Sequence, residues 1–233
     1  MNFSRLKRQI ERCISRLSSE YHLTPASILT ESDLKSRLQH LLTHLSVSRC
    51  RSVASRHQAL PVTAVHSDLS WFDENHRLRI RPDITILEPE HLRTRYSLHQ
   101  VFDPFSGGGY RFRRGERLPS KQFGFTGNTI TLELKFARNG IDKAMAKLIL
   151  KDFQKMNRLF RLLDDRGEGD PIFSYLVIFN SLNQPPWHTP LAEFFEQNKS
   201  SARHRILYKT WRPSASRSFR FIGTKRSALN GWR

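Results

Sequence analysis

The sequence contains few cysteines and no long apolar run. Its two cysteines, Cys13 and Cys50, have no metal-site or disulfide spacing, so we expect ordinary reduced thiols. The longest uninterrupted aliphatic or aromatic stretch covers residues 175–179, far short of the roughly 20 residues that a membrane span needs. Charges begin at Arg5 and leave no apolar region for a signal peptide. We therefore expect a cytoplasmic protein with no membrane partner.

Acidic residues are also scarce, and one whole segment has none. The chain has 39 Lys and Arg against 21 Asp and Glu, and the net charge of +18 favours a polyanionic partner. Residues 197–233 hold ten Lys and Arg and no acidic residue, with aromatic rings interleaved at Tyr208, Trp211, Phe219, Phe221 and Trp232. Cations mixed with aromatic rings suit phosphates and unstacked bases, so we predict nucleic-acid binding. The alternatives are a solvated basic extension and an anionic membrane surface, although no amphipathic basic helix is evident for the latter.

The pattern of apolar residues predicts a single α/β domain. Spacings of three and four residues predict helices at residues 3–18 and 31–45, and a third helix is expected at residues 142–163. Strands are expected at residues 62–71, 78–87, 129–136 and 172–179, the first two as a hairpin turning at residues 73–76. A hairpin and a strand-helix-strand crossover together imply a mixed sheet flanked by helices. The chain then divides into an N-terminal helix (1–23), a core (24–183) with an insertion at 88–127, and a basic C-terminal extension (184–233). The alternative for the last segment is that residues 205–209 and 219–222 are strands that complete the sheet.

Two predicted strands carry a carboxylate in mid-run. In residues 129–136 the even-numbered residues are apolar, so Glu133 and Lys135 share the other face, about 7 Å apart along the strand. Asp83 lies on the polar face of residues 78–87. Strand propensity disfavours Asp and Glu, so these positions indicate a function that offsets the cost. The alternative is a Glu–Lys ion pair on an exposed sheet face.

A third carboxylate begins the second predicted helix. Glu31 continues the apolar stripe of Leu34 and Leu38, whereas Asp33 lies on the outward face and forms a capping box with Thr30. A carboxylate on the inward side is costly unless it is paired or binds a metal, which makes Glu31 a candidate site residue. The alternative is that Glu31 only complements the positive end of the helix dipole.

Pro82-Asp83, followed some fifty residues later by Glu133-Leu134-Lys135, resembles the signature of the PD-(D/E)xK nuclease superfamily. The predicted order of helix, strand, strand, strand, helix and strand is similar to that family's core, and the resemblance covers roughly residues 24–180. It implies a restriction-endonuclease-like fold and a metal-dependent DNA endonuclease that hydrolyses phosphodiester bonds, of the sort found in restriction, phage defence or mobile elements.

The resemblance also assigns roles to the site residues. Asp83, Glu133 and the backbone carbonyl of Leu134 would hold Mg²⁺, for which Mn²⁺ would substitute, and Glu31 would bind the ion directly or through water. A water held by the metal would attack the phosphodiester. Lys135 would orient that water or stabilise charge on the phosphate.

Basic residues outside this motif are the candidates for nucleic-acid contact. Lysines recur every four residues along the third predicted helix, for which a solvated face is the alternative. The candidates are Lys143, Lys147, Lys151 and Lys155 in the helix, Arg113 and Arg114 in the insertion, and Arg205, Lys209 and Arg212 in the basic extension. DNA is the expected partner, with a ribonuclease or a non-catalytic nucleic-acid-binding protein as alternatives. Cutting both strands of a duplex would favour a homodimer or a larger defence or transposition complex.

Overall fold

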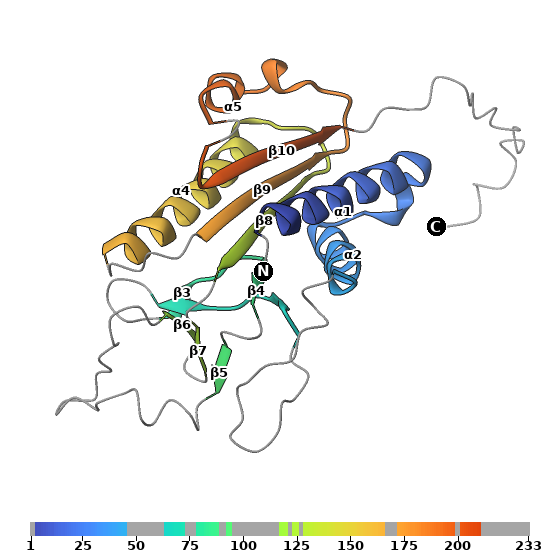
Figure 1. Ribbon diagram of the computed structural model, residues 1–233. Helices are drawn as coiled ribbons and strands as arrows, with labels where there is room; N and C mark the ends of the chain where they lie inside the picture. Colours follow the sequence, from blue (N-terminus) through green and yellow to red (C-terminus); the bar gives the residue numbers. More distant parts are fainter. Residues whose placement is uncertain are drawn as a thin grey trace, which may run out of the picture.

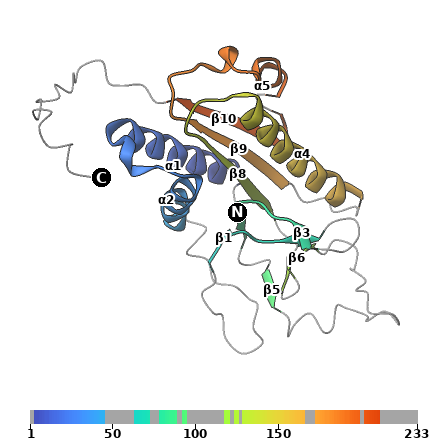
Figure 2. The ribbon, with the colours of Figure 1, turned by 180° about the vertical axis from the view of Figure 1, so that it is seen from behind.

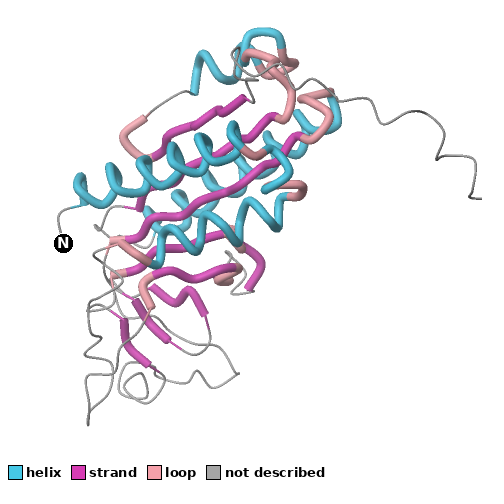
Figure 3. Tube along the Cα trace, turned by 90° about the vertical axis from the view of Figure 1, so that its right-hand side faces the viewer, coloured by secondary structure: helices cyan, strands magenta, loops and turns pink. Residues whose placement is uncertain are grey.

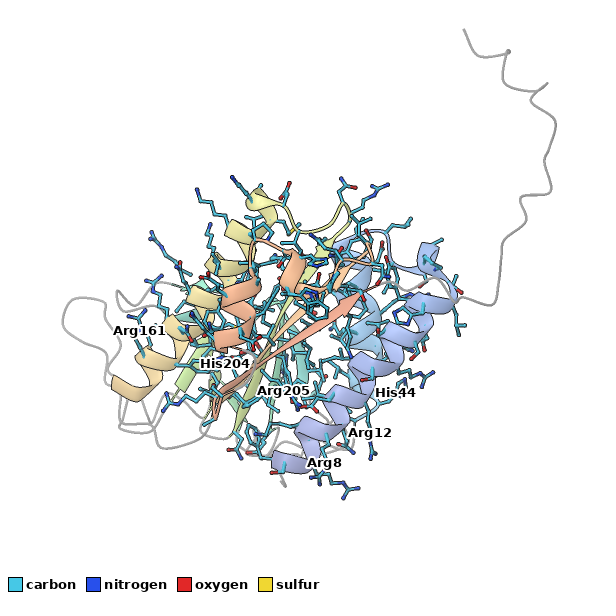
Figure 4. All side chains as sticks on the ribbon, turned by 90° about the horizontal axis from the view of Figure 1, so that it is seen from above. Arg8, Arg12, His44, Arg161, His204 and Arg205 are labelled. Carbon is cyan, nitrogen blue, oxygen red and sulfur yellow. The ribbon has the colours of Figure 1, made fainter. Side chains whose placement is uncertain are left out.

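A sheet lies between two layers of helices (Figure 1). The computed structural model describes residues 3–45, 63–72, 78–88, 92–94, 117–120, 123–125, 128–165, 172–198 and 201–210. Helices α1 (Phe3–Leu23) and α2 (Glu31–Thr43) cover one face of the sheet, and α4 (Lys143–Asp165) and α5 (Ala192–Asn198) lie on the other side. Seen from above, Arg8 and Arg12 project from α1 and Arg161 from α4 (Figure 4). The predicted class, an α/β fold with a mixed sheet flanked by helices, is confirmed.

Helix α1 packs against the sheet through an apolar stripe with helical spacing. Its buried side chains include Leu6, Ile10, Ile14 and Leu17. Tyr21 continues the stripe and meets Phe136 and Phe179 edge-on, with ring centroids 6.0 Å apart in both pairs. These contacts hold the last turn, so α1 runs to Leu23 instead of ending at residue 18.

Helix α2 begins at the predicted residue because its cap is present. The Thr30 hydroxyl accepts a 3.1 Å hydrogen bond from the Asp33 amide, and the Asp33 carboxylate accepts one of 2.9 Å from the Thr30 amide. The predicted capping box is therefore confirmed. A short 3-10 turn (Pro25–Ser27) joins the two helices, which cross in front of the strands in Figure 3.

The main sheet has five strands in the order β1-β4-β8-β9-β10. They are β1 (Val65–Ser67), β4 (Ile84–Leu87), β8 (Thr129–Ala137), β9 (Ile172–Asn180) and β10 (His204–Thr210). Strands β1, β4 and β8 pair antiparallel, whereas β8, β9 and β10 pair in parallel, because α4 and α5 return the chain between them. The view from behind shows α4 running along β8 and β9 (Figure 2). Strands β8 and β9 and helix α4 end within two residues of their predicted bounds.

The two strands of the predicted hairpin pair antiparallel, but both are divided, and the predicted turn at residues 73–76 lies outside the described residues. β1 pairs with β4 in the main sheet, whereas β2 (Trp71–Phe72) pairs with β3 (Leu78–Ile80) in a separate ribbon. The division lies at Asp68, whose φ is 53°, and at Pro82, which has no N–H for a ladder hydrogen bond. The ribbon turns toward α4, since Trp71 and Ile80 belong to the apolar cluster of that helix. We call the junction of residues 81–83 with residues 133–135 of β8 the fork.

The described residues of the insertion form strands of their own. β5 (Leu92–Thr94), β6 (Arg117–Ser120) and β7 (Phe123–Phe125) make a small antiparallel sheet in the order β5-β7-β6. It is not part of the five-stranded sheet, as expected for an insertion, although its strands were not predicted.

The C-terminal boundary of the core differs from the prediction. Residues 184–233 were assigned to a basic extension, yet β10 pairs with β9 along its whole length and buries Ile206. The sheet therefore continues past residue 183 to Thr210, with a 3-10 turn (Pro186–His188) and α5 leading into its last strand. Residues 211–233 lie outside the described part. Among the described residues, no helix combines the length and apolar character needed to cross a membrane.

Candidate active site

Asp83 lies at the fork, where its side chain replaces a strand-to-strand hydrogen bond. Strand β4 starts at Ile84, which pairs with Leu132, so Pro82 falls opposite Leu134 if the register is continued. Proline cannot donate to the Leu134 carbonyl, and the Leu134 amide instead donates a 2.8 Å hydrogen bond to Asp83 Oδ2. The Pro-Asp pair thus ends the ladder and brings a carboxylate against β8.

Glu133 is buried beneath the fork on the α4-facing side of β8. Its side chain is only 1% exposed, and Oε1 has no hydrogen-bond partner among the described residues. Oε2 accepts a 2.7 Å hydrogen bond from Lys155 Nζ. Burial, together with the negative charges of Asp83 and Asp152, raises the pKa of Glu133 to about 8 against the lowering effect of Lys155. The site therefore has an excess of closely placed negative charge.

Lys135 joins the two helix layers at the end of the same strand. Its Nζ lies 3.1 Å and 3.2 Å from the two carboxylate oxygens of Glu31 on α2, and 3.0 Å from Asp152 Oδ2 on α4. Burial alone would lower the pKa of Lys135, but the hydrogen bond and charge of Asp152 and the charge of Glu31 raise it to about 12. Lys135 is therefore a fixed cation at neutral pH.

The structure brings together the four residues predicted to be catalytic and adds two from α4. Asp83, Glu133, Lys135 and Glu31 are linked directly or through Asp152 and Lys155. Sequence reasoning missed Asp152, although a signal existed. Asp152 is three residues after Ile149 and four before Met156, both buried, so it lies beside the inward stripe of α4.

The lysine row of α4, predicted to contact nucleic acid, is not uniform. Lys143, Lys147 and Lys151 are exposed, as a nucleic-acid contact would require. Lys155 instead turns inward and donates to Glu133, to the backbone carbonyl of Arg81 at 3.1 Å, and lies 3.4 Å from Asp152 Oδ1. Its ammonium group faces three protein oxygens, so it belongs to the fork and does not extend the exposed row.

Of the remaining predicted nucleic-acid residues, the two that the structure describes, Arg205 and Lys209, lie on β10, away from the site. Arg205 is on the α1 side of the sheet, where its guanidinium binds Glu11 Oε1 at 2.7 Å (Figure 4). Lys209 follows four residues later on the same strand and is half-buried. Arg113, Arg114 and Arg212 lie outside the described residues.

A metal cage built from protein side chains alone is absent from the described residues, which hold no group of three or more His, Cys, Asp or Glu arranged for a metal. Mg²⁺ needs less than that, because it commonly binds through one or two carboxylates and keeps several waters. Asp83 and Glu133 supply two carboxylates, and the buried, unpartnered Glu133 Oε1 is an oxygen that a hard cation would satisfy. The donors therefore fit a hydrated Mg²⁺ or Mn²⁺.

The comparisons with known proteins found no relative. No family model matches the sequence, and neither the curated proteins nor the solved structures gave a match.

Proposed function

We propose that the chain is a Mg²⁺-dependent nuclease that hydrolyses phosphodiester bonds in DNA. The observation that carries the proposal is the convergence of Asp83, Glu133 and Lys135 at one fork, with a carboxylate oxygen of Glu133 buried and unpartnered among the described residues. The order α2, β1, β4, β8, α4, β9 supports it, because it is the order expected for a PD-(D/E)xK core. On this proposal the fold is restriction-endonuclease-like, with β10 as an added edge strand.

The side chains divide the chemistry between them. Asp83 and Glu133 would hold the metal ion, together with the Leu134 carbonyl that Pro82 leaves without a ladder donor. When bound, the ion supplies Lewis acidity and a water of lowered pKa. Lys135 keeps its proton because Glu31 and Asp152 raise its pKa to about 12, so it does not serve as a general base. Its fixed charge instead stabilises the negative charge that develops on the phosphate.

The exposed cations of α4 and the six Lys and Arg in the sequence of residues 211–233 would supply affinity for the substrate. Lys143, Lys147 and Lys151 lie on the helix that carries Asp152. A phosphate contact on duplex DNA contributes about 0.9 to the slope of log K against log salt, so removing residues 211–233 should flatten that slope. The truncation starts at residue 211 because β10 belongs to the sheet.

The test is cleavage of supercoiled plasmid and of single-stranded RNA by the purified chain, with Mg²⁺ or with EDTA. We expect Mg²⁺-dependent nicking or linearisation of DNA, blocked by EDTA and reduced roughly 100- to 1000-fold in Lys135→Ala. Lys147→Ala is the matched control, because it removes an exposed lysine outside the fork, so it should weaken DNA binding but keep the cleavage rate at saturating enzyme concentration. A wild-type cleavage rate in Lys135→Ala, or cleavage that continues in EDTA, would refute the proposed active site.

A second candidate is a non-catalytic nucleic-acid-binding protein. The observation in its favour is the Lys155–Glu133 ion pair, which already gives the buried carboxylate a cation. In the same experiment this candidate predicts salt-sensitive DNA binding with no cleavage in either Mg²⁺ or Mn²⁺. Cleavage of RNA alone would identify a ribonuclease.

A further inference from the structure

Glu133 already has a cation in this structure, and that cation is Lys155 of α4. The Lys155 Nζ lies 2.7 Å from Glu133 Oε2, the shortest ion-pair distance at the fork. The carboxylate is buried, whereas the Lys155 side chain is 27% exposed. The ion pair therefore joins a buried carboxylate to a side chain that keeps part of its surface exposed.

The position of Lys155 is held by two further oxygens. It donates to the Arg81 carbonyl at 3.1 Å, on the ribbon side of the fork, and lies 3.4 Å from Asp152 Oδ1 one turn earlier on α4. An ammonium group has three donor hydrogens, and three acceptors face it here. Lys151, the preceding lysine of the same helix row, is exposed and has none of these contacts.

Two cations cannot bind the same carboxylate at no cost. A divalent ion on Glu133 would lie within a few ångströms of the Lys155 ammonium group. Two positive charges at that distance repel strongly in a partly buried site. Either the ammonium group moves away and gives up a buried ion pair, or it stays and repels the metal. Both outcomes weaken metal binding.

We propose that Lys155 is an internal competitor of the divalent cation, a positioning residue that holds Glu133 until the metal displaces it. This inference rests on the proposed function, because it assumes a metal on Glu133. It assigns Lys155 a role opposite to that of a phosphate ligand. Loss of a phosphate ligand would weaken nucleic-acid binding and leave the metal affinity unchanged. Loss of a competitor would instead raise the affinity for the metal ion.

The test is Mg²⁺ binding by isothermal titration calorimetry, without nucleic acid, at pH 8.5, where fewer protons compete for Glu133. Lys155→Met should lower the Mg²⁺ Kd at least tenfold and enlarge the rise in melting temperature that Mg²⁺ causes. Lys151→Met is the matched control, and its Kd should stay within about twofold of wild type. Lys155→Gln, which keeps an N–H donor for Glu133 but removes the charge, should also tighten binding and serves if Lys155→Met does not fold.

Glu133→Gln separates the two proposals. If wild type binds Mg²⁺ and Glu133→Gln does not, while neither Lys155 variant binds more tightly, the competitor role is overturned and the metal site stands. If Glu133→Gln binds Mg²⁺ as wild type does, or if no variant binds the ion, both proposals fall. An equal fall in the Mg²⁺ Kd of Lys151→Met and Lys155→Met would show that only the lower net charge of the protein matters. That result would also overturn the competitor role.

Discussion

The two faces of β8 are both largely buried but differ in chemistry. Toward α1 and α2, Ile130, Leu132 and Leu134 are fully buried in an apolar cluster. Toward α4, Thr129 and Glu133 are buried to the same degree but are polar. Thr129 Oγ1 and Glu133 Oε1 have no hydrogen-bond partner among the described residues, and burying such atoms costs stability. One face of the strand stabilises the fold, and the other gives up stability to hold charged groups in place.

The largest effect on stability is expected on the apolar face. Leu132→Ala should lower the free energy of unfolding by about 2–5 kcal/mol, because it opens a cavity in a fully buried layer. Urea unfolding followed by circular dichroism measures it. Thr129→Val is the control on the other face and should leave stability unchanged or raise it, because it removes an unpartnered hydroxyl. A larger loss in Thr129→Val than in Leu132→Ala would reverse the contrast between the faces.

The next effect is a dependence of stability on pH that arises from Glu133. Because the folded pKa of Glu133 is about 8 and its ordinary value is 4.5, the folded state keeps a proton that the unfolded chain releases between these pH values. Stability from this group is therefore highest below pH 4.5, falls as the pH rises to 8 and is constant above it. The fall is on the order of a few kcal/mol, at about 1.4 kcal/mol per pKa unit.

Glu133→Gln isolates that dependence. The difference in unfolding free energy between wild type and Glu133→Gln, measured in urea at pH 5 and pH 8, should move in favour of the variant at the higher pH. If the unfolding free energy of wild type instead rises relative to that of the variant as the pH rises, the Lys155 ion pair outweighs the cost of burial. That outcome would contradict a raised pKa for Glu133.

The smallest effect is expected at α2, where Glu31 contacts Lys135 on the polar face of β8. Glu31→Gln should lower cleavage about tenfold, because Lys135 loses one of the two charges that hold it, a loss of about 1.4 kcal/mol of transition-state stabilisation. Asp33→Asn is the control, since Asp33 caps the helix and does not contact Lys135. Equal, small changes in the cleavage rates of the two variants would show that Glu31 acts only as a helix-start residue.

The long elements were predictable because their residues follow one pattern without interruption. Strands β8 and β9 and helix α4 end within two residues of expectation, and the Thr30–Asp33 cap placed the start of α2. The hairpin was predicted as two long strands because alternation continues through the fork. The break depends on the backbone at Asp68 and on Pro82 opposite Leu134, which are tertiary properties. β10 was predicted only as an alternative to a basic extension, because its charged residues lie among those of a basic segment.

The site was predictable where strand alternation fixes a side chain's face and, for Glu31, where the apolar stripe of a helix does. Alternation placed Glu133 and Lys135 together, and the polar face of the earlier strand supplied Asp83. The two α4 residues of the site, Asp152 and Lys155, could not be placed in this way. Lys155 shares its spacing with three exposed lysines, and its partners, Glu133 and the Arg81 carbonyl, are 22 and 74 residues away in sequence. Helical spacing alone does not tell which lysine of a row turns inward.

The fork also joins two parts of the molecule that should unfold at different temperatures. Asp83 and the Arg81 carbonyl stand at the base of a ribbon whose strands are only two and three residues long, whereas Glu133 belongs to a nine-residue central strand. Short, peripheral strands open at lower free energy than central ones. Local opening of the ribbon would withdraw one carboxylate and release Lys155 from Arg81 while β8 stays paired with β9. Heating would then inactivate the site before it melts the sheet, and cooling would restore it without any need to refold the core.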